Sequence, residues 1–140
     1  HIIPNILKRA IALSEGRTDV PPLMLFGSDY PTRDGTCVRD YIHTLDLAQA
    51  HLRGLDYLMA GGESGAFNLG TGEGVSLRAL VRAVGEFTGV SVPYSVGPRR
   101  DGDPARLVAD PSRAWQLLGW QAQHSSLENI VKTAWAWATR

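Results

Sequence analysis

Residues 26–43 read Phe26-Gly27-Ser28-Asp29-Tyr30-Pro31-Thr32-Arg33-Asp34-Gly35-Thr36-Cys37-Val38-Arg39-Asp40-Tyr41-Ile42-His43. The stretch opens as an apolar strand, passes through two turn signals, Tyr30-Pro31 and Asp34-Gly35, and returns as an extended segment. Connections in compact domains usually run to about 4–6 residues, and longer ones tend to be functional. Arg39, which follows this long loop, is therefore a candidate for contact with a ligand.

Length and composition indicate one globular domain. The chain has 140 residues, of which 44% are hydrophobic and 20% charged. Fourteen basic residues balance fourteen acidic ones, so there is no overall attraction to nucleic acid or to an acidic membrane. No apolar run approaches the roughly 18 residues of a membrane span. We see no signal peptide, and one cysteine, Cys37, excludes an intrachain disulfide. A cytoplasmic location is expected.

Hydrophobic spacing predicts a mixed α/β fold. Strands are expected at residues 23–26, 66–69 and 92–96, where short apolar or alternating runs occur. Helices are expected from Ile2 to the stop at Gly16, over 44–59 with Thr44 as N-cap, and from Ser76 to Gly89. A short helix follows Asp110-Pro111, and Ser125 with Glu128 predicts a capping box for a last helix. Because the chain starts at His1 within a helical pattern, it is expected to be part of a larger protein.

Two groups of residues suggest nucleotide binding. Gly70-Thr71-Gly72-Glu73-Gly74 lies between a predicted strand and a predicted helix, but a complete G-x-G-x-x-G needs glycine where the chain has Val75. A tight turn is therefore favoured there over a cofactor site. The second group is Arg39 together with Arg99, Arg100, Asp101 and Asp103. Arginine binds phosphate oxygens through two parallel hydrogen bonds, and carboxylates accept from ribose hydroxyls. Ion pairs on the surface are the open alternative.

Several kinds of chemistry are not expected. The histidines have no ligand-like spacing, which argues against a metal site. Short-chain dehydrogenase chemistry uses a tyrosine four residues before a lysine, but Pro4 and Glu128 stand at that spacing before Lys8 and Lys132. We therefore expect no catalytic residue and no cofactor-binding residue in this chain. The tryptophans are expected to be packing residues, because no basic run alternates with them.

The stretch from Phe26 to His43 resembles the signature of the UDP-glucose 4-epimerases (UDP-galactose 4-epimerases), which are extended short-chain dehydrogenases/reductases. The resemblance continues in later blocks: Asp46-Leu47-Ala48, Phe67-Asn68-Leu69-Gly70-Thr71-Gly72, Pro98-Arg99-Arg100-x-Gly102-Asp103, Ala109-Asp110-Pro111-Ser112-x-Ala114 and Leu118-Gly119-Trp120. It covers nearly the whole chain. It implies that residues 1–140 are a C-terminal UDP-sugar-binding domain, with about residues 44–70 packing on a Rossmann domain absent from this chain.

The resemblance also implies site residues. Arg39 and Arg100 would hold the diphosphate, and Asp103 would bind the uridine ribose. Leu23, Met24 and Phe26 would frame the uracil, with Leu77 on its other side and Tyr41 nearby. Ile2 would lie close to the diphosphate, and Leu107 would limit the room beside the sugar and so disfavour N-acetylated sugars.

The function implied by the resemblance is NAD-dependent interconversion of UDP-galactose and UDP-glucose through a 4-keto sugar. NAD would be bound by the N-terminal domain, so residues 1–140 alone would be inactive. The expected partners are a UDP-sugar, the N-terminal domain and, in a homodimer, a second copy, with no nucleic acid and no membrane. Alternatives are a UDP-xylose/UDP-arabinose 4-epimerase, a nucleotide-sugar dehydratase, or a non-catalytic nucleotide-sugar-binding module.

Overall fold

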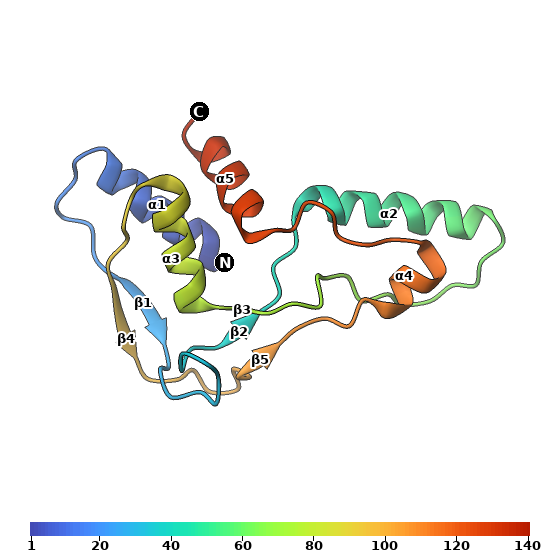
Figure 1. Cartoon of the computed structure of the whole chain (residues 1–140), viewed down its shortest axis with the longest axis horizontal. Coiled ribbons are helices and arrows are strands. Elements are labelled where there is room, and N and C mark those ends of the chain that lie inside the picture. The colour runs from blue at the N-terminus through green and yellow to red at the C-terminus, as the bar shows by residue number, and fades with distance from the viewer.

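The computed structural model describes all 140 residues and confirms a small mixed α/β fold. In chain order the elements are α1 (Ile2–Ser14), β1 (Leu23–Phe26), β2 (Val38–Arg39), α2 (Thr44–Met59), β3 (Val75–Ser76), α3 (Leu77–Thr88), β4 (Tyr94–Gly97), β5 (Arg106–Leu107), α4 (Ser112–Leu118) and α5 (Leu127–Ala138). Figure 1 shows two lobes: α1, α3 and α5 gather beside β1 and β4, while α2 and α4 extend to the other side. None of the helices is long and apolar enough to cross a membrane.

The larger core is centred on α3. Its residues Leu80 and Val84 are fully buried, at the spacing that places them on one helical face. Ser76 caps the helix by accepting a hydrogen bond from the N–H of Ala79 at 3.2 Å. Gly89 ends it with φ of 75°, a left-handed conformation that favours glycine. Both predicted ends of this helix are thus confirmed.

The smaller core joins α2 to α4. Its buried residues are Ala50, Ala114, Leu118 and Trp120. Trp120 donates its indole N–H to the carbonyl of Asp46 at 2.9 Å. The Asp46 carboxylate, which is fully buried, accepts from the N–H groups of Gln123 and His124 at 2.9 Å each. These bonds fix the connection between α4 and α5 against the start of α2.

Two small sheets link the elements. β1 and β4 run parallel, with Phe26 opposite Gly97. The other sheet has the order β3-β2-β5, in which β2 is antiparallel to β3 and parallel to β5. This three-stranded sheet lies where the two lobes meet (Figure 1). Because each of its strands has two residues, it depends on contacts beyond its own ladder.

The loop between β1 and β2 is held by Asp34 and shaped by Gly35. The Asp34 carboxylate accepts from the N–H and hydroxyl of Thr36, at 2.9 and 2.7 Å, and from the hydroxyl of Ser76. Gly35 has φ of 80°, and a Cβ there would lie 2.1 Å from the carbonyl oxygen of Ser28. The turn therefore requires glycine at position 35. The hydrogen bond from Ser76 to Asp34 fixes the loop to the start of α3.

Several predicted boundaries are wrong in detail. Residues 66–69 form no strand, because no neighbouring strand pairs with them and their apolar side chains pack on the smaller core instead. The strand expected over 92–96 begins at Tyr94, and Val92 is buried ahead of it. His43, through Nδ1, caps α2 in place of Thr44. At α5 the cap is Ser126, because the hydroxyl of Ser125 donates to Asp46.

Candidate functional site

Arg39 lies in β2, and neighbouring strands hold its backbone on both sides. It pairs with β3 on one side and with Leu107 of β5 on the other. The N–H of Asp40 donates to the carbonyl of Leu107 at 3.2 Å, and the N–H of Val38 donates to that of Ala105 at 2.8 Å. These bonds fix the point at which the Arg39 side chain leaves the sheet.

The guanidinium group of Arg39 is paired with Asp103, which the sequence also predicts as a site residue. It donates in addition to the carbonyl oxygen of Pro104 at 3.0 Å. The side chains of Arg39 and Asp103 remain 19% and 30% exposed, so both can be reached from solvent. Phosphate oxygens accept from guanidinium in the same way as a carboxylate does. The pair can therefore open toward a phosphate.

Phe26 and Arg100 form a second contact within the candidate site. The guanidinium carbon of Arg100 lies 3.9 Å from the centre of the Phe26 ring, which is a cation–π distance. Met24 shares the face of β1 with Phe26, because side chains alternate along a strand, and it is exposed. An aromatic ring, a thioether and a cation thus lie together, which suits a planar base beside an anionic group.

The side chains of Leu23 and Leu77 lie in the core rather than beside Phe26 and Arg100. Both belong to the larger core, where they are 3% and 9% exposed. The side chain of Leu23 points to the face of β1 opposite Met24 and Phe26. The part of both leucines in framing a base therefore stays a prediction, and their side chains in this structure contact the core.

Tyr41 and Ile2 lie at the edge of the larger core, partly buried. Burial raises the pKa of Tyr41 to about 12, with Cys37 adding to the shift and Arg39 opposing it. The phenol is therefore protonated at neutral pH. Its buried hydroxyl has no hydrogen-bond partner, so it retains a free donor in the neighbourhood of Arg39.

Cys37 is buried and directly precedes β2. Burial raises the pKa of its thiol, Arg39 and Arg100 oppose that shift, and Asp103 adds to it. The thiol stays protonated at neutral pH and is not an activated nucleophile. Arg39 is paired with Asp103, and the N–H of Asp103 donates to the carbonyl of Arg100 at 3.2 Å, so Arg100 belongs to the same turn as Asp103. Arg99, by contrast, pairs with Asp29 on the surface, at 2.8 Å.

Asp40 is the residue of this region that sequence reasoning missed. Its carboxylate accepts from the N–H groups of Thr71 and Gly72, at 3.1 Å each, and from the hydroxyl of Thr71 at 2.6 Å. Within the Gly70–Gly74 loop, the N–H groups of Thr71, Gly72 and Glu73 are thus bonded within the chain. These three N–H groups are therefore not free to donate to a phosphate in this structure.

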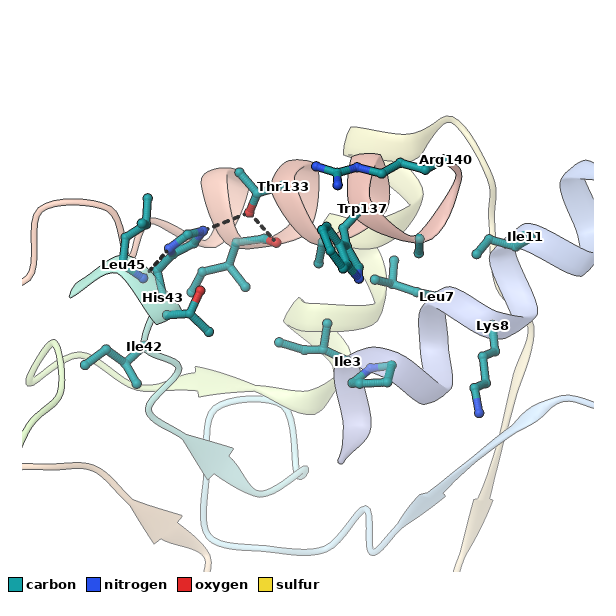
Figure 2. Close-up of a pocket in the computed structure, with 15 residues that line it drawn as sticks. Ile3, Leu7, Lys8, Ile11, Ile42, His43, Leu45, Thr133, Trp137 and Arg140 are labelled. Carbon is teal, nitrogen blue, oxygen red and sulfur yellow. Dashed lines mark hydrogen bonds between the residues drawn. The ribbon is translucent and has the colours of Figure 1, made fainter. Parts of the chain in front are cut away.

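A large apolar hollow lies apart from these residues. It measures about 770 Å³ and is bounded by α1, α5 and residues 42–45. Figure 2 shows Ile3 and Leu7 of α1 facing Trp137 of α5 across it, with His43 at one end. His43 lies 3.0 Å from the hydroxyl of Thr133 through Nε2. None of the predicted site residues lines this hollow.

Comparison with known proteins identifies the class. The chain belongs to the family described as GDP-mannose 4,6 dehydratase, whose profile matches residues 2–134. Within that class its relatives are named UDP-glucose 4-epimerase. The one from Lacticaseibacillus casei is 44% identical over 137 residues, which make up 98% of this chain and 40% of that protein.

Solved structures lead to the same enzymes. A UDP-glucose 4-epimerase from Stenotrophomonas maltophila, with bound NAD and formylated UDP-arabinopyranose, matches with a TM-score of 0.91 and 43% identity, over 99% of this chain and 39% of that one. The enzyme from Bifidobacterium longum, in complex with NAD+ and UDP, matches with a TM-score of 0.85 and 35% identity over the same shares. The chain thus spans about 40% of the length of the curated relatives it matches, and it corresponds to their C-terminal part.

Proposed function

We propose that residues 1–140 bind the UDP part of the substrate in an NAD-dependent UDP-glucose 4-epimerase, which interconverts UDP-galactose and UDP-glucose. The observation that carries the proposal is the Arg39–Asp103 pair together with Arg100, which lies in the same turn as Asp103 and over the ring of Phe26. Two forked cations, a carboxylate and an aromatic face match a diphosphate, a ribose and a base in turn. Relatives at 42–46% identity carry the epimerase name, which supports the same conclusion.

Binding would exchange one acceptor for another at Arg39. A phosphate oxygen takes the place of the Asp103 carboxylate on the guanidinium group, and Asp103 becomes free to accept from the ribose hydroxyls. Both side chains are partly exposed, so neither must leave a sealed core. Arg100 lies over the Phe26 ring and in the same turn as Asp103, and we expect it to contact the second phosphate. Leu107, opposite Arg39 in the sheet, is 60% exposed and stands where we expect the sugar.

This arrangement holds the substrate by atoms remote from the reacting carbon. Epimerisation needs the oxidised sugar to turn over while the nucleotide stays in place, and binding energy from the nucleotide serves that purpose. NAD, held by a part of the polypeptide outside residues 1–140, would take up and return the hydride. Within residues 1–140 no tyrosine–lysine pair is present to move the proton.

We further propose that residues 44–70 pack on the NAD-binding domain of the complete protein. Leu52 and Leu55 of α2 are 63% and 54% exposed, although both are large apolar side chains on an amphipathic helix. The apolar hollow between α1 and α5 opens beside the start of the same segment. A homodimeric, cytoplasmic enzyme remains our prediction for the complete protein.

The proposal is tested with the full-length polypeptide that contains residues 1–140. In calorimetry, Arg39→Ala and Arg100→Ala should each bind UDP about tenfold more weakly than wild type, or weaker still, because a charge-assisted hydrogen bond contributes roughly 1.5–3 kcal/mol. Arg17→Ala is the matched control, since Arg17 is an exposed arginine paired only with Asp19. Unchanged UDP affinity in both site variants would contradict the assignment.

A pentose substrate is the second candidate, favoured by the arabinopyranose that the Stenotrophomonas maltophila enzyme holds. A panel of UDP-galactose, UDP-glucose, UDP-xylose and UDP-arabinose on the full-length protein separates the two. If the substrate is a UDP-hexose, kcat/KM should be highest with UDP-galactose. Preference for a UDP-pentose would replace it.

A further inference from the structure

We infer that Asp40 is a positioning residue for nucleotide binding: its carboxylate fixes the two segments that flank β2 and thereby sets the position of Arg39. The inference rests on the proposed function, because Arg39 is there the ligand for the diphosphate. Asp40 directly follows Arg39 in the chain and is itself half-buried.

The contacts of Asp40 reach both neighbours of β2. On one side the N–H and hydroxyl of Thr71 and the N–H of Gly72 donate to it, in the loop that leads into β3. On the other side the N–H of Ala109, just beyond β5, donates to it at 3.3 Å. One carboxylate therefore joins three segments, two of which lie 31 and 69 residues away in sequence.

These bonds matter because the sheet itself is small. β2, β3 and β5 have two residues each, so few ladder hydrogen bonds hold Arg39 in place. The carboxylate accepts hydrogen bonds from four donors at the end of β2, where the ladder stops. An ionised carboxylate is an acceptor only, which matches a ring of N–H and O–H donors. An amide in its place would direct an N–H₂ group at some of those donors.

The surroundings fit a carboxylate of this size closely. A Cβ at Gly70 would lie 2.5 Å from one oxygen of Asp40 and 2.6 Å from Cβ of Ala109. Gly70 thus leaves the space that Asp40 occupies. No lysine or arginine forms an ion pair with Asp40, so its bonds go to backbone N–H groups and the Thr71 hydroxyl rather than to a neighbouring charge. Arg39, which we expect to bind phosphate, and Asp40, which holds it in place, are therefore consecutive residues with different partners.

The test uses UDP calorimetry on the full-length protein. Asp40→Asn should weaken UDP binding about tenfold, because Arg39 is no longer held in place. In an Arg39→Ala background the same substitution should change affinity by less than about twofold, since Asp40 acts through Arg39. Thr71→Val, which removes one donor, should weaken binding about threefold, and Thr71→Ser, which keeps the hydroxyl, should restore it.

Asp46→Asn is the matched control, because Asp46 also accepts from two N–H groups and a hydroxyl but lies in the first turn of α2, outside the sheet that carries Arg39. It should lower thermal stability and leave UDP affinity unchanged. Wild-type affinity in Asp40→Asn and Thr71→Val, or an equal loss with and without Arg39, would overturn the inference. If Arg39→Ala binds UDP with wild-type affinity, the proposed function itself is wrong. That result differs from one in which only the Asp40 and Thr71 variants keep wild-type affinity.

Discussion

Asp46 shows how one buried carboxylate can organise distant segments. Burial alone would raise its pKa, but hydrogen bonds from Ser125 and from the N–H groups of Gln123 and His124 lower it below its ordinary value of 3.8. A carboxyl group with a lowered pKa in the folded state stabilises the fold above about pH 3.8, where the unfolded chain is also ionised. That stability is lost as the pH falls through the folded-state pKa.

Replacement of Asp46 by asparagine should therefore destabilise the protein at neutral pH by about 2 kcal/mol, because several donors lose their charged acceptor. The melting temperature should fall by roughly 5–10 °C. Calorimetric scans from pH 7 to pH 3 should show the difference from wild type narrowing as the acid limit is approached. A pH-independent difference would contradict the linkage argument.

Leu107 is the residue at which we expect sugar choice to be decided. It lies opposite Arg39 and exposes most of its side chain. In the full-length protein, Leu107→Ala should raise the kcat/KM ratio of UDP-N-acetylglucosamine to UDP-glucose by about tenfold, because space opens beside the sugar. Met24→Ala, at an exposed position on β1, is the comparison variant and should leave that ratio unchanged. Equal wild-type turnover of the two sugars would refute the role of Leu107.

At the scale of elements, α2 has an exposed apolar face that its own chain does not cover. Leu52→Glu and Leu55→Glu together should leave the melting temperature of residues 1–140 within about 2 °C, since both side chains already contact solvent. In the full-length protein the same pair should reduce stability and NAD binding if α2 packs on the NAD-binding domain. The exposed Gln49, changed to Glu, provides the control on the same helix.

The elements that could be predicted are those whose signals are local. The helical spacing of Leu80 and Val84, the Ser76 cap and the Gly89 stop all depend on neighbours within one helix, and all are confirmed. The prediction of a strand at residues 66–69 was wrong, because a strand needs a neighbouring strand to pair with and a short apolar run does not supply one. The cap of α5 moved by one residue because the hydroxyl of Ser125 serves Asp46, far away in sequence.

The sequence suggests the charged members of the candidate site but not the residue that supports them. Arg39, Arg100 and Asp103 stand out because their types suit a nucleotide and their blocks resemble a known signature. Asp40 lies in one of those blocks, but its residue type does not reveal its role: an aspartate beside an arginine predicts a surface ion pair as readily as a junction of three segments. Leu23 matched the resemblance, yet the alternation of β1 directs its side chain into the core.

For the molecule as a whole, residues 1–140 should have no epimerase activity. The expected UDP-binding groups are present, but no tyrosine–lysine pair is present within them to act on the sugar. Purified 1–140 incubated with UDP-galactose and NAD should give no UDP-glucose in a coupled assay, and the full-length protein serves as the positive control. Product formed by 1–140 alone would contradict the division of roles between the two parts.

The three-stranded sheet between the lobes also has a consequence for the order of folding. Arg39 and Asp103 are 64 residues apart in sequence, and the strands that bring them together contribute two residues each. Loop closure of that length costs chain entropy before the new contacts repay it, so such contacts form slowly. We expect pulsed hydrogen exchange during refolding to protect the amides of α3 before those of Val38 and Asp40, so that the sheet that carries Arg39 is the last part to become native.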